Sequence, residues 1–177
     1  MANNVQNIIE ISYNGEDHIR SFFEKIENIK RNNDCIDLLY EESEETRDWW
    51  ERNIGAKWAY IEDFYFDESS ATLTIVSAWA EVAPLVRFID EQTNKETKIH
   101  FTYIDEMPNF IGRVTYENGE IVDKYEEMDM WTVIEEEAAI REKAENKNFA
   151  DGGERNDWLW DWMWDFVYET LDSGSRI

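Results

Sequence analysis

Hydrophobic and polar positions near the start of the chain alternate first with a strand period and then with a helix period. Residues 7–13 (NIIEISY) predict a β-strand, and Asn14-Gly15 predicts the turn that ends it. A helix from about Glu16 to Lys30 is expected next. Its apolar face would consist of Ile19, Phe22, Phe23, Ile26 and Ile29, which recur at helical spacing.

The pattern continues with a short helix and two aromatic strands. Residues 35–40 fit either a short strand or a turn. Ser43 is a plausible N-cap for a helix over 43–55, because acidic residues follow it in the first turn and Gly55 suits its end. The segments 58–66 and 71–79 are rich in aromatic and β-branched residues and predict a hairpin.

A second core helix is expected over about 81–93, with Pro84 in its first turn. Strands are then predicted at 98–104, 110–116 and 121–125, and Asn118-Gly119 is a strong hairpin signal between the last two. Beyond Tyr125 the pattern becomes helical. Thr132 and Glu135 have capping-box spacing and predict a helix to about Asn146, and after the interruption at 151–153 a final helix covers about 154–171.

This order predicts an α+β fold. When the additional elements named below are set aside, the order of the predicted elements is the β-α-β-β-α-β motif of a ferredoxin-like antiparallel sheet with helices on one face. The additions are a β-hairpin and C-terminal acidic and aromatic helices. We therefore expect a domain at 1–127 and a helical extension at 128–177 packed on it.

Several short motifs resemble the YubB-type ferredoxin-like proteins of phages and plasmids over about residues 1–125. The motifs are Ala2-Asn3-Asn4-Val5-Gln6-Asn7, Gly55-Ala56-Lys57-Trp58-Ala59, Ser77-Ala78-Trp79-Ala80, Asp105-Glu106 with Asn109-Phe110-Ile111-Gly112, and Tyr116-Glu117-Asn118-Gly119-Glu120. The resemblance implies the fold and an origin in a mobile element. It implies no enzymatic activity, because a fold does not fix a function.

The strongest compositional feature of the chain is its negative charge. The chain has 177 residues and a formal net charge of −24, yet it is 42% hydrophobic and contains nine tryptophans. Disordered acidic segments lack such aromatic content, so a folded body with a negative surface is expected. Duplex DNA carries one charge per ~1.7 Å, so this charge equals that of ~40 Å of DNA, which is also about the diameter of a compact chain of this length.

The acidic residues gather in three groups, which are the candidate partner-binding residues. The first group is Glu41, Glu42, Glu44, Glu45, Asp48 and Glu51, the second is Glu126, Glu127, Asp129, Glu135 and Glu136, and the third is Asp157, Asp161, Asp165 and Glu169. The aromatic residues Trp160 and Trp164 are candidates as well. In the last group the carboxylates recur every four residues, so a helix aligns them into one stripe. For each group, a merely solvated surface is the alternative interpretation.

The final helix carries the densest signal. Trp158, Leu159, Trp162, Met163, Phe166 and Val167 form an apolar face that should be buried, whereas Trp160, Trp164 and Tyr168 fall between that face and the acidic stripe. Large rigid aromatic rings beside carboxylates suit an Arg-rich partner.

Other chemistry is weakly represented. Two histidines without partners at ligand spacing and one cysteine predict neither a metal site nor a cofactor, and no phosphate loop or nucleophile motif is present. The single Cys35 is expected to be buried and suits a reducing cytosol. The N-terminal residues lack the features of a signal peptide, and no segment is apolar enough to span a membrane.

The sequence therefore predicts a non-enzymatic, phage- or plasmid-encoded anti-defence protein of the host bacterial cytoplasm. Its expected partner is a basic protein or nucleoprotein complex of the CRISPR or restriction type, whose nucleic-acid channel it occupies as a DNA mimic. Direct binding to nucleic acid or membrane is not expected, because both repel an acidic surface. The alternatives are an assembly module, including a homodimer, that uses the terminal helix, and a small-ligand sponge or enzyme that uses a pocket between the sheet and the helices.

Overall fold

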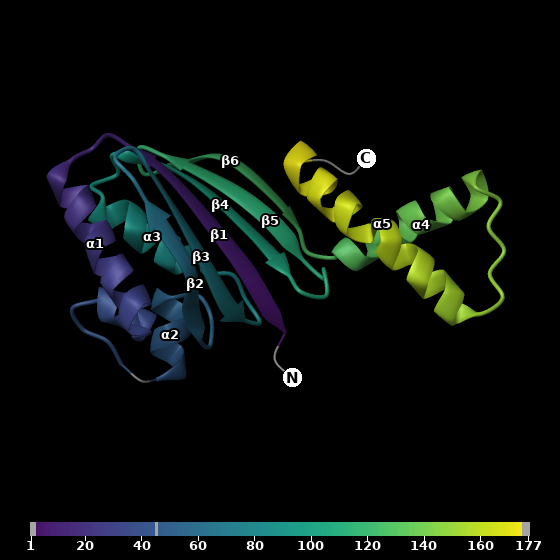
Figure 1. The fold of residues 1–177 in the computed structure, drawn as a ribbon, viewed down its shortest axis with the longest axis horizontal. Coiled ribbons are helices and arrows are strands. Elements are labelled where there is room, and N and C mark those ends of the chain that lie inside the picture. The colour runs from purple at the N-terminus through teal and green to yellow at the C-terminus, as the bar shows by residue number, and fades with distance from the viewer. Residues whose placement is uncertain (1–2, 45, 175–177) are drawn as a thin grey trace. The chain divides into compact units, whose positions relative to one another are not determined.

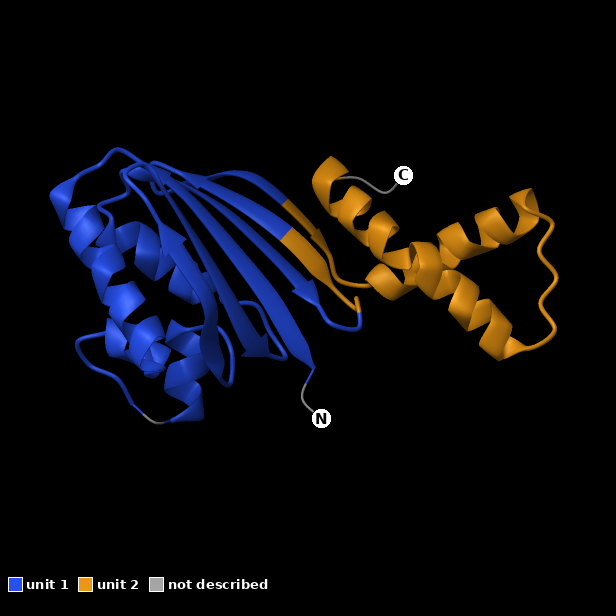
Figure 2. Cartoon of the chain, in the orientation of Figure 1, with its two compact units in different colours: residues 1–107, 113–124 blue, residues 108–112, 125–177 orange. Residues whose placement is uncertain are grey.

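The computed structural model describes residues 3–44 and 46–174. The chain forms two compact units (Figure 2). Unit 1 comprises residues 1–107 and 113–124, and unit 2 comprises residues 108–112 and 125–177.

The elements of the first unit follow the predicted order closely. They are β1 (Asn4–Tyr13), α1 (Asp17–Asn32), a 3₁₀ turn η1 (Ile36–Leu39), α2 (Arg47–Asn53), β2 (Ala59–Phe66), β3 (Ser70–Ala78), α3 (Ala83–Gln92), β4 (Thr97–Asp105), β5 (Ile111–Glu117) and β6 (Glu120–Glu127). The ends of β5 and β6 belong to the second unit.

The strands form one open sheet in the order β2-β3-β1-β4-β5-β6. Strand β1 pairs antiparallel with both β3 and β4, and β2 pairs antiparallel with β3. Asn118 and Gly119 have φ angles of 54° and 78°, as the predicted two-residue hairpin between β5 and β6 requires. The predicted α+β class with an antiparallel sheet is confirmed.

The core of unit 1 lies between the sheet and the helices on one of its faces, where α1 and α3 cover the strands (Figure 1). Alternate residues of β1 are buried, and Ile9 stands opposite Leu73 and Phe101 on the neighbouring strands. Phe23 of α1 packs edge-on against Tyr13 at 5.1 Å between ring centroids. Burial of side chains of this size contributes ~1.5–3 kcal/mol each, which explains why the strand and helix periods mark these elements so clearly.

The segment before α2 differs from its prediction. The helix begins at Arg47, and its N-cap is Thr46, whose Oγ1 accepts the N–H of Trp49 at 3.3 Å. The prediction of Ser43 as the cap was wrong, because the buried Trp49 fixes which residues can form the first turn. The alternatives at 35–40 resolve to η1, and Cys35 is exposed rather than buried.

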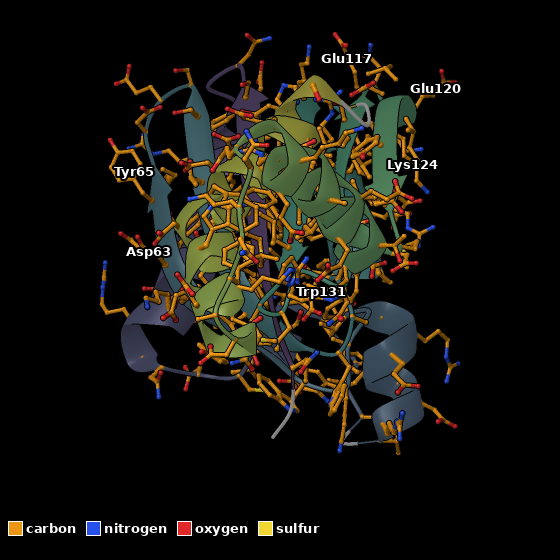
Figure 3. All side chains as sticks on the ribbon, turned by 90° about the vertical axis from the view of Figure 1, so that its right-hand side faces the viewer. Asp63, Tyr65, Glu117, Glu120, Lys124 and Trp131 are labelled. Atoms are coloured by element: carbon orange, nitrogen blue, oxygen red, sulfur yellow. The ribbon has the colours of Figure 1, made fainter. Side chains whose placement is uncertain are left out.

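The two edge strands of the sheet, β2 and β6, carry charged side chains. Asp63 and Tyr65 lie on β2, and Glu120 and Lys124 lie on β6 (Figure 3). Strand β2 also contains a register shift between Ile61 and Asp63. Charges and bulges on edge strands discourage pairing with another sheet.

Unit 2 contains α4 (Met130–Ala144) and α5 (Gly152–Ser173). Asp129 caps α4, so the predicted capping box at Thr132 and Glu135 was wrong: the carboxylate of Asp129 accepts the side-chain hydroxyl of Thr132 at 2.7 Å. Arg155 of α5 binds two carboxylates of α4, Glu135 at 2.8 Å and Glu142 at 2.6 Å, and so joins the two helices.

Candidate functional site

The acidic stripe predicted for the last helix forms on α5. Asp157, Asp161, Asp165 and Glu169 are all exposed. At 1.5 Å per residue, successive members are spaced ~6 Å apart along the helix axis. No ion pair to any of these four carboxylates exists within the described part of the chain. The stripe therefore keeps its full charge for a partner.

A row of aromatic rings runs beside the stripe. The ring centroids of Trp160 and Trp164 are 6.3 Å apart, and those of Trp164 and Tyr168 are 6.4 Å apart. Trp160 is 43% exposed and Tyr168 is 47% exposed, while Trp164 is half-buried. This row lies ~60° around the helix axis from the carboxylates. Below, these seven residues are called the α5 face.

The opposite side of α5 is apolar and buried, as predicted. Leu159, Met163, Phe166 and Val167 are each at most 3% exposed. The guanidinium of Arg141 on α4 lies 4.3 Å from the ring centroid of Trp162, which is half-buried. These contacts fix the rotation of α5 about its axis, and so they leave the acidic stripe, with Trp160 and Trp164 at its border, on the side away from the buried face.

The first acidic group differs from the sequence expectation. Glu41, Glu42 and Glu44 are exposed but precede α2, so they cannot form a helical stripe with Asp48 and Glu51. Glu51 is engaged by Arg47, whose Nε lies 2.6 Å from its Oε1. Glu45, which was predicted to belong to this group, lies outside the described residues.

Most of the second acidic group serves the chain's own structure. Glu127 is buried and accepts the N–H of Asp129 at 3.2 Å, and Asp129 caps α4. Glu135 binds Arg155. Glu126, at the end of β6, and Glu136, on α4, are exposed. The α5 face is therefore the strongest of the three predicted sites.

Sequence reasoning missed a second feature, a pocket of ≈ 510 Å³ in unit 1. Its lining includes Arg47, Glu51, Lys57 and Trp79, from α2 and from the segments that precede β2 and follow β3. Two of the motifs that carry the family resemblance, at 55–59 and 77–80, meet here. Their meeting depends on the sheet register, which sequence spacing does not reveal.

Neither a metal site nor a membrane span is found in the described residues. No group of three or more potential ligand side chains is arranged to hold a metal ion. Each helix in the described ranges is too short or too polar to cross a bilayer. In comparisons with known protein families, curated proteins and solved structures, none matches this chain.

Proposed function

We propose that this chain is an acidic inhibitor protein that uses the α5 face to bind the basic nucleic-acid channel of a host defence complex. The observation that carries the proposal is an exposed aromatic row beside four carboxylates without a cation partner in the described chain. Aromatic rings and guanidinium groups dominate the energetics of protein interfaces, and an arginine can bind a carboxylate while stacking on an indole. An Arg-rich surface is the partner that this arrangement fits.

The spacing of the carboxylates limits what the α5 face can imitate. One strand of a duplex carries a charge every ~3.4 Å of axis, whereas the stripe carries one every ~6 Å. The α5 face therefore presents a little over half the linear charge of one DNA strand. Mimicry by this face would rest on the combination of charge and stacking surface, with the overall charge of −24 accelerating encounter by electrostatic steering.

The strand order supports a second part of the proposal. Four neighbouring strands have the order β4-β1-β3-β2, with α1 following β1 and α3 following β3. This is the arrangement of a split β-α-β motif. We assign unit 1 to the ferredoxin-like class on this basis, and propose a phage or plasmid origin and action in the bacterial cytoplasm from the YubB-type motifs.

A charge-removal variant tests the α5 face. Replacing three acids of the stripe, Asp157→Asn, Asp161→Asn and Asp165→Asn, should weaken the capture of basic proteins from bacterial lysate about tenfold or more at low salt. The matched control removes three exposed carboxylates elsewhere, in Glu62→Gln, Glu68→Gln and Glu120→Gln, and should retain capture. An equal loss of capture in both variants would show that binding follows total charge, and unchanged capture by the α5 variant would show that the α5 face has no role.

Competition with DNA tests the mechanism. An excess of duplex DNA should release the captured protein, because inhibitor and nucleic acid would occupy the same channel. Persistent binding in excess DNA would contradict mimicry. If the captured protein is a second copy of this chain, the function is assembly rather than inhibition.

A further inference from the structure

The pocket in unit 1 has the opposite charge from the rest of the protein. Its lining contains two cations, Arg47 and Lys57, and one carboxylate, Glu51, in a chain whose net charge is −24. Glu51 is neutralised by Arg47 at 2.6 Å. Lys57 is exposed, and within the described residues no carboxylate forms an ion pair with it. An anion in this pocket would meet Lys57 and Arg47, the two cations of its lining.

Trp79 gives the pocket an aromatic wall. Its φ angle is 72°, in the left-handed region that a bulky side chain rarely adopts. The residue is 56% exposed, and no other aromatic ring of the described chain contacts its indole. Strained backbone of this kind persists only where the surroundings impose it, and it concentrates at ligand sites.

The surroundings of Trp79 do impose this conformation. Its N–H donates to the carbonyl of Asn3 at 3.0 Å, and the N–H of the preceding Ala78 donates to the carbonyl of Trp58 at 3.1 Å. On the other side of Trp79, the carbonyl of Ala80 accepts the hydroxyl of Ser77 at 2.6 Å. The backbone is thus anchored immediately before and after the strained residue.

Asn7 fixes the far end of the same loop. Its amide group is fully buried; the side-chain nitrogen donates to Ser77 Oγ at 2.8 Å and its oxygen accepts the N–H of Val82 at 3.0 Å. A buried, fully bonded amide holds its neighbours in one arrangement. The indole of Trp79 is therefore presented in a preformed position.

We propose that this pocket binds a nucleoside monophosphate, with the base stacked on Trp79 and the phosphate bound by Lys57 and Arg47. Every nucleobase can stack on an indole, and lysine and arginine are the usual phosphate ligands. The volume of ≈ 510 Å³ lies within the range of small-molecule sites. The proposal concerns unit 1 alone and is independent of the function proposed for α5.

A neighbouring pocket is a weaker candidate for the same ligand. It is lined by Arg52 and Arg87, but its aromatic rings, Tyr40 and Phe88, stack on each other at 4.0 Å. The hydroxyl of Tyr40 also donates to the carbonyl of Asn53 at 2.7 Å. Because these rings already have partners, the Trp79 pocket is the one of these two that offers a ring face for a base.

Calorimetric titration of the full chain with AMP tests the proposal. AMP should bind. Adenosine, which lacks the phosphate, and ribose 5-phosphate, which lacks the base, should each bind at least about fivefold more weakly. Trp79→Gly, which suits the left-handed backbone, and Lys57→Gln should each weaken AMP binding at least about fivefold, the lower end of the loss expected for one base stack. Asn also tolerates this conformation, so Trp79→Asn replaces the glycine variant if that variant fails to fold.

Matched controls are Tyr65→Leu, an exposed aromatic residue outside the pocket, and Lys143→Gln, an exposed lysine of α4; both should bind AMP normally. Absence of AMP binding at millimolar concentration would overturn the proposal, as would equal affinity for adenosine or unchanged affinity in the folded Trp79 variant. A single-stranded oligonucleotide that binds more tightly than AMP would overturn the assignment to a mononucleotide.

Discussion

At the scale of single residues, one buried amide has an effect far beyond its position in the chain. Asn7 occupies a core-facing place in β1, where apolar side chains are the rule, and yet its side chain joins two strands, β1 and β3, and the loop that follows β3. Besides its bonds to Ser77 and Val82, its nitrogen donates to the carbonyls of Val5 and Ile75. These hydrogen bonds of Asn7 fix the geometry of the loop that carries Trp79.

Replacing this amide by a hydrocarbon of similar size should destabilise the protein strongly. Asn7→Leu leaves the N–H of Val82 and the hydroxyl of Ser77 buried with fewer partners, which should lower the free energy of unfolding by about 2 kcal/mol or more. Urea denaturation followed by circular dichroism measures the change. Gln6→Ala, at the exposed neighbouring position, is the control and should cost less than about 0.5 kcal/mol. A loss in Asn7→Leu as small as that of the control would mean that the network adds nothing to stability.

At the scale of elements, the residues that the sequence predicts as a break before the last helix form the cap and first turn of α5. Residues 151–153 suggested a break before a helix at about residue 154. In the structure Asp151 is the N-cap, and its Oδ1 accepts the N–H groups of Gly153 at 2.9 Å and Glu154 at 3.0 Å. The two glycines disfavour a helix by propensity, but the cap satisfies the exposed amides and offsets that cost.

Removing the cap should loosen the start of the helix that carries the α5 face. Asp151→Ala should lower the free energy of unfolding by about 1 kcal/mol, because two backbone N–H groups lose their acceptor and the helix dipole loses an anion. Asp151→Ser should recover most of this loss. Urea denaturation monitored by tryptophan fluorescence reports on it, since four of the nine tryptophans lie on α5. Equal stability of the alanine and serine variants would contradict the capping role.

The elements also show which parts of the fold can be predicted from sequence. Strand and helix periods identified β1, α1 and α3 because these elements bury one face against a single core. The start of α2 was misplaced because several residues before it could cap a helix, and the choice depends on the burial of Trp49. The α5 face followed from local spacing alone, whereas the Trp79 pocket joins residues about 25 positions apart through the pairing of β2 with β3.

At the scale of the whole molecule, the charged side chains divide into those that form ion pairs and those that repel one another. The ion pairs within the chain, such as those of Arg155 with Glu135 and Glu142, use cations that are scarce in this sequence. The remaining carboxylates, including the stripe on α5, repel one another. A net charge of −24 therefore opposes folding while it favours encounter with a basic partner.

Salt should therefore stabilise the isolated protein even as it weakens binding. Raising NaCl from 0.01 M to 0.15 M shortens the screening length from ~30 Å to ~8 Å, which suppresses repulsion among distant carboxylates more than attraction within close ion pairs. The midpoint of thermal unfolding should rise by several degrees.

KCl should act equally, since screening depends on ionic strength and not on the identity of the ion. A larger rise with MgCl₂ at the same ionic strength would instead indicate bound cations. An unchanged or lower midpoint in NaCl would show that attraction within the ion pairs outweighs repulsion among the carboxylates.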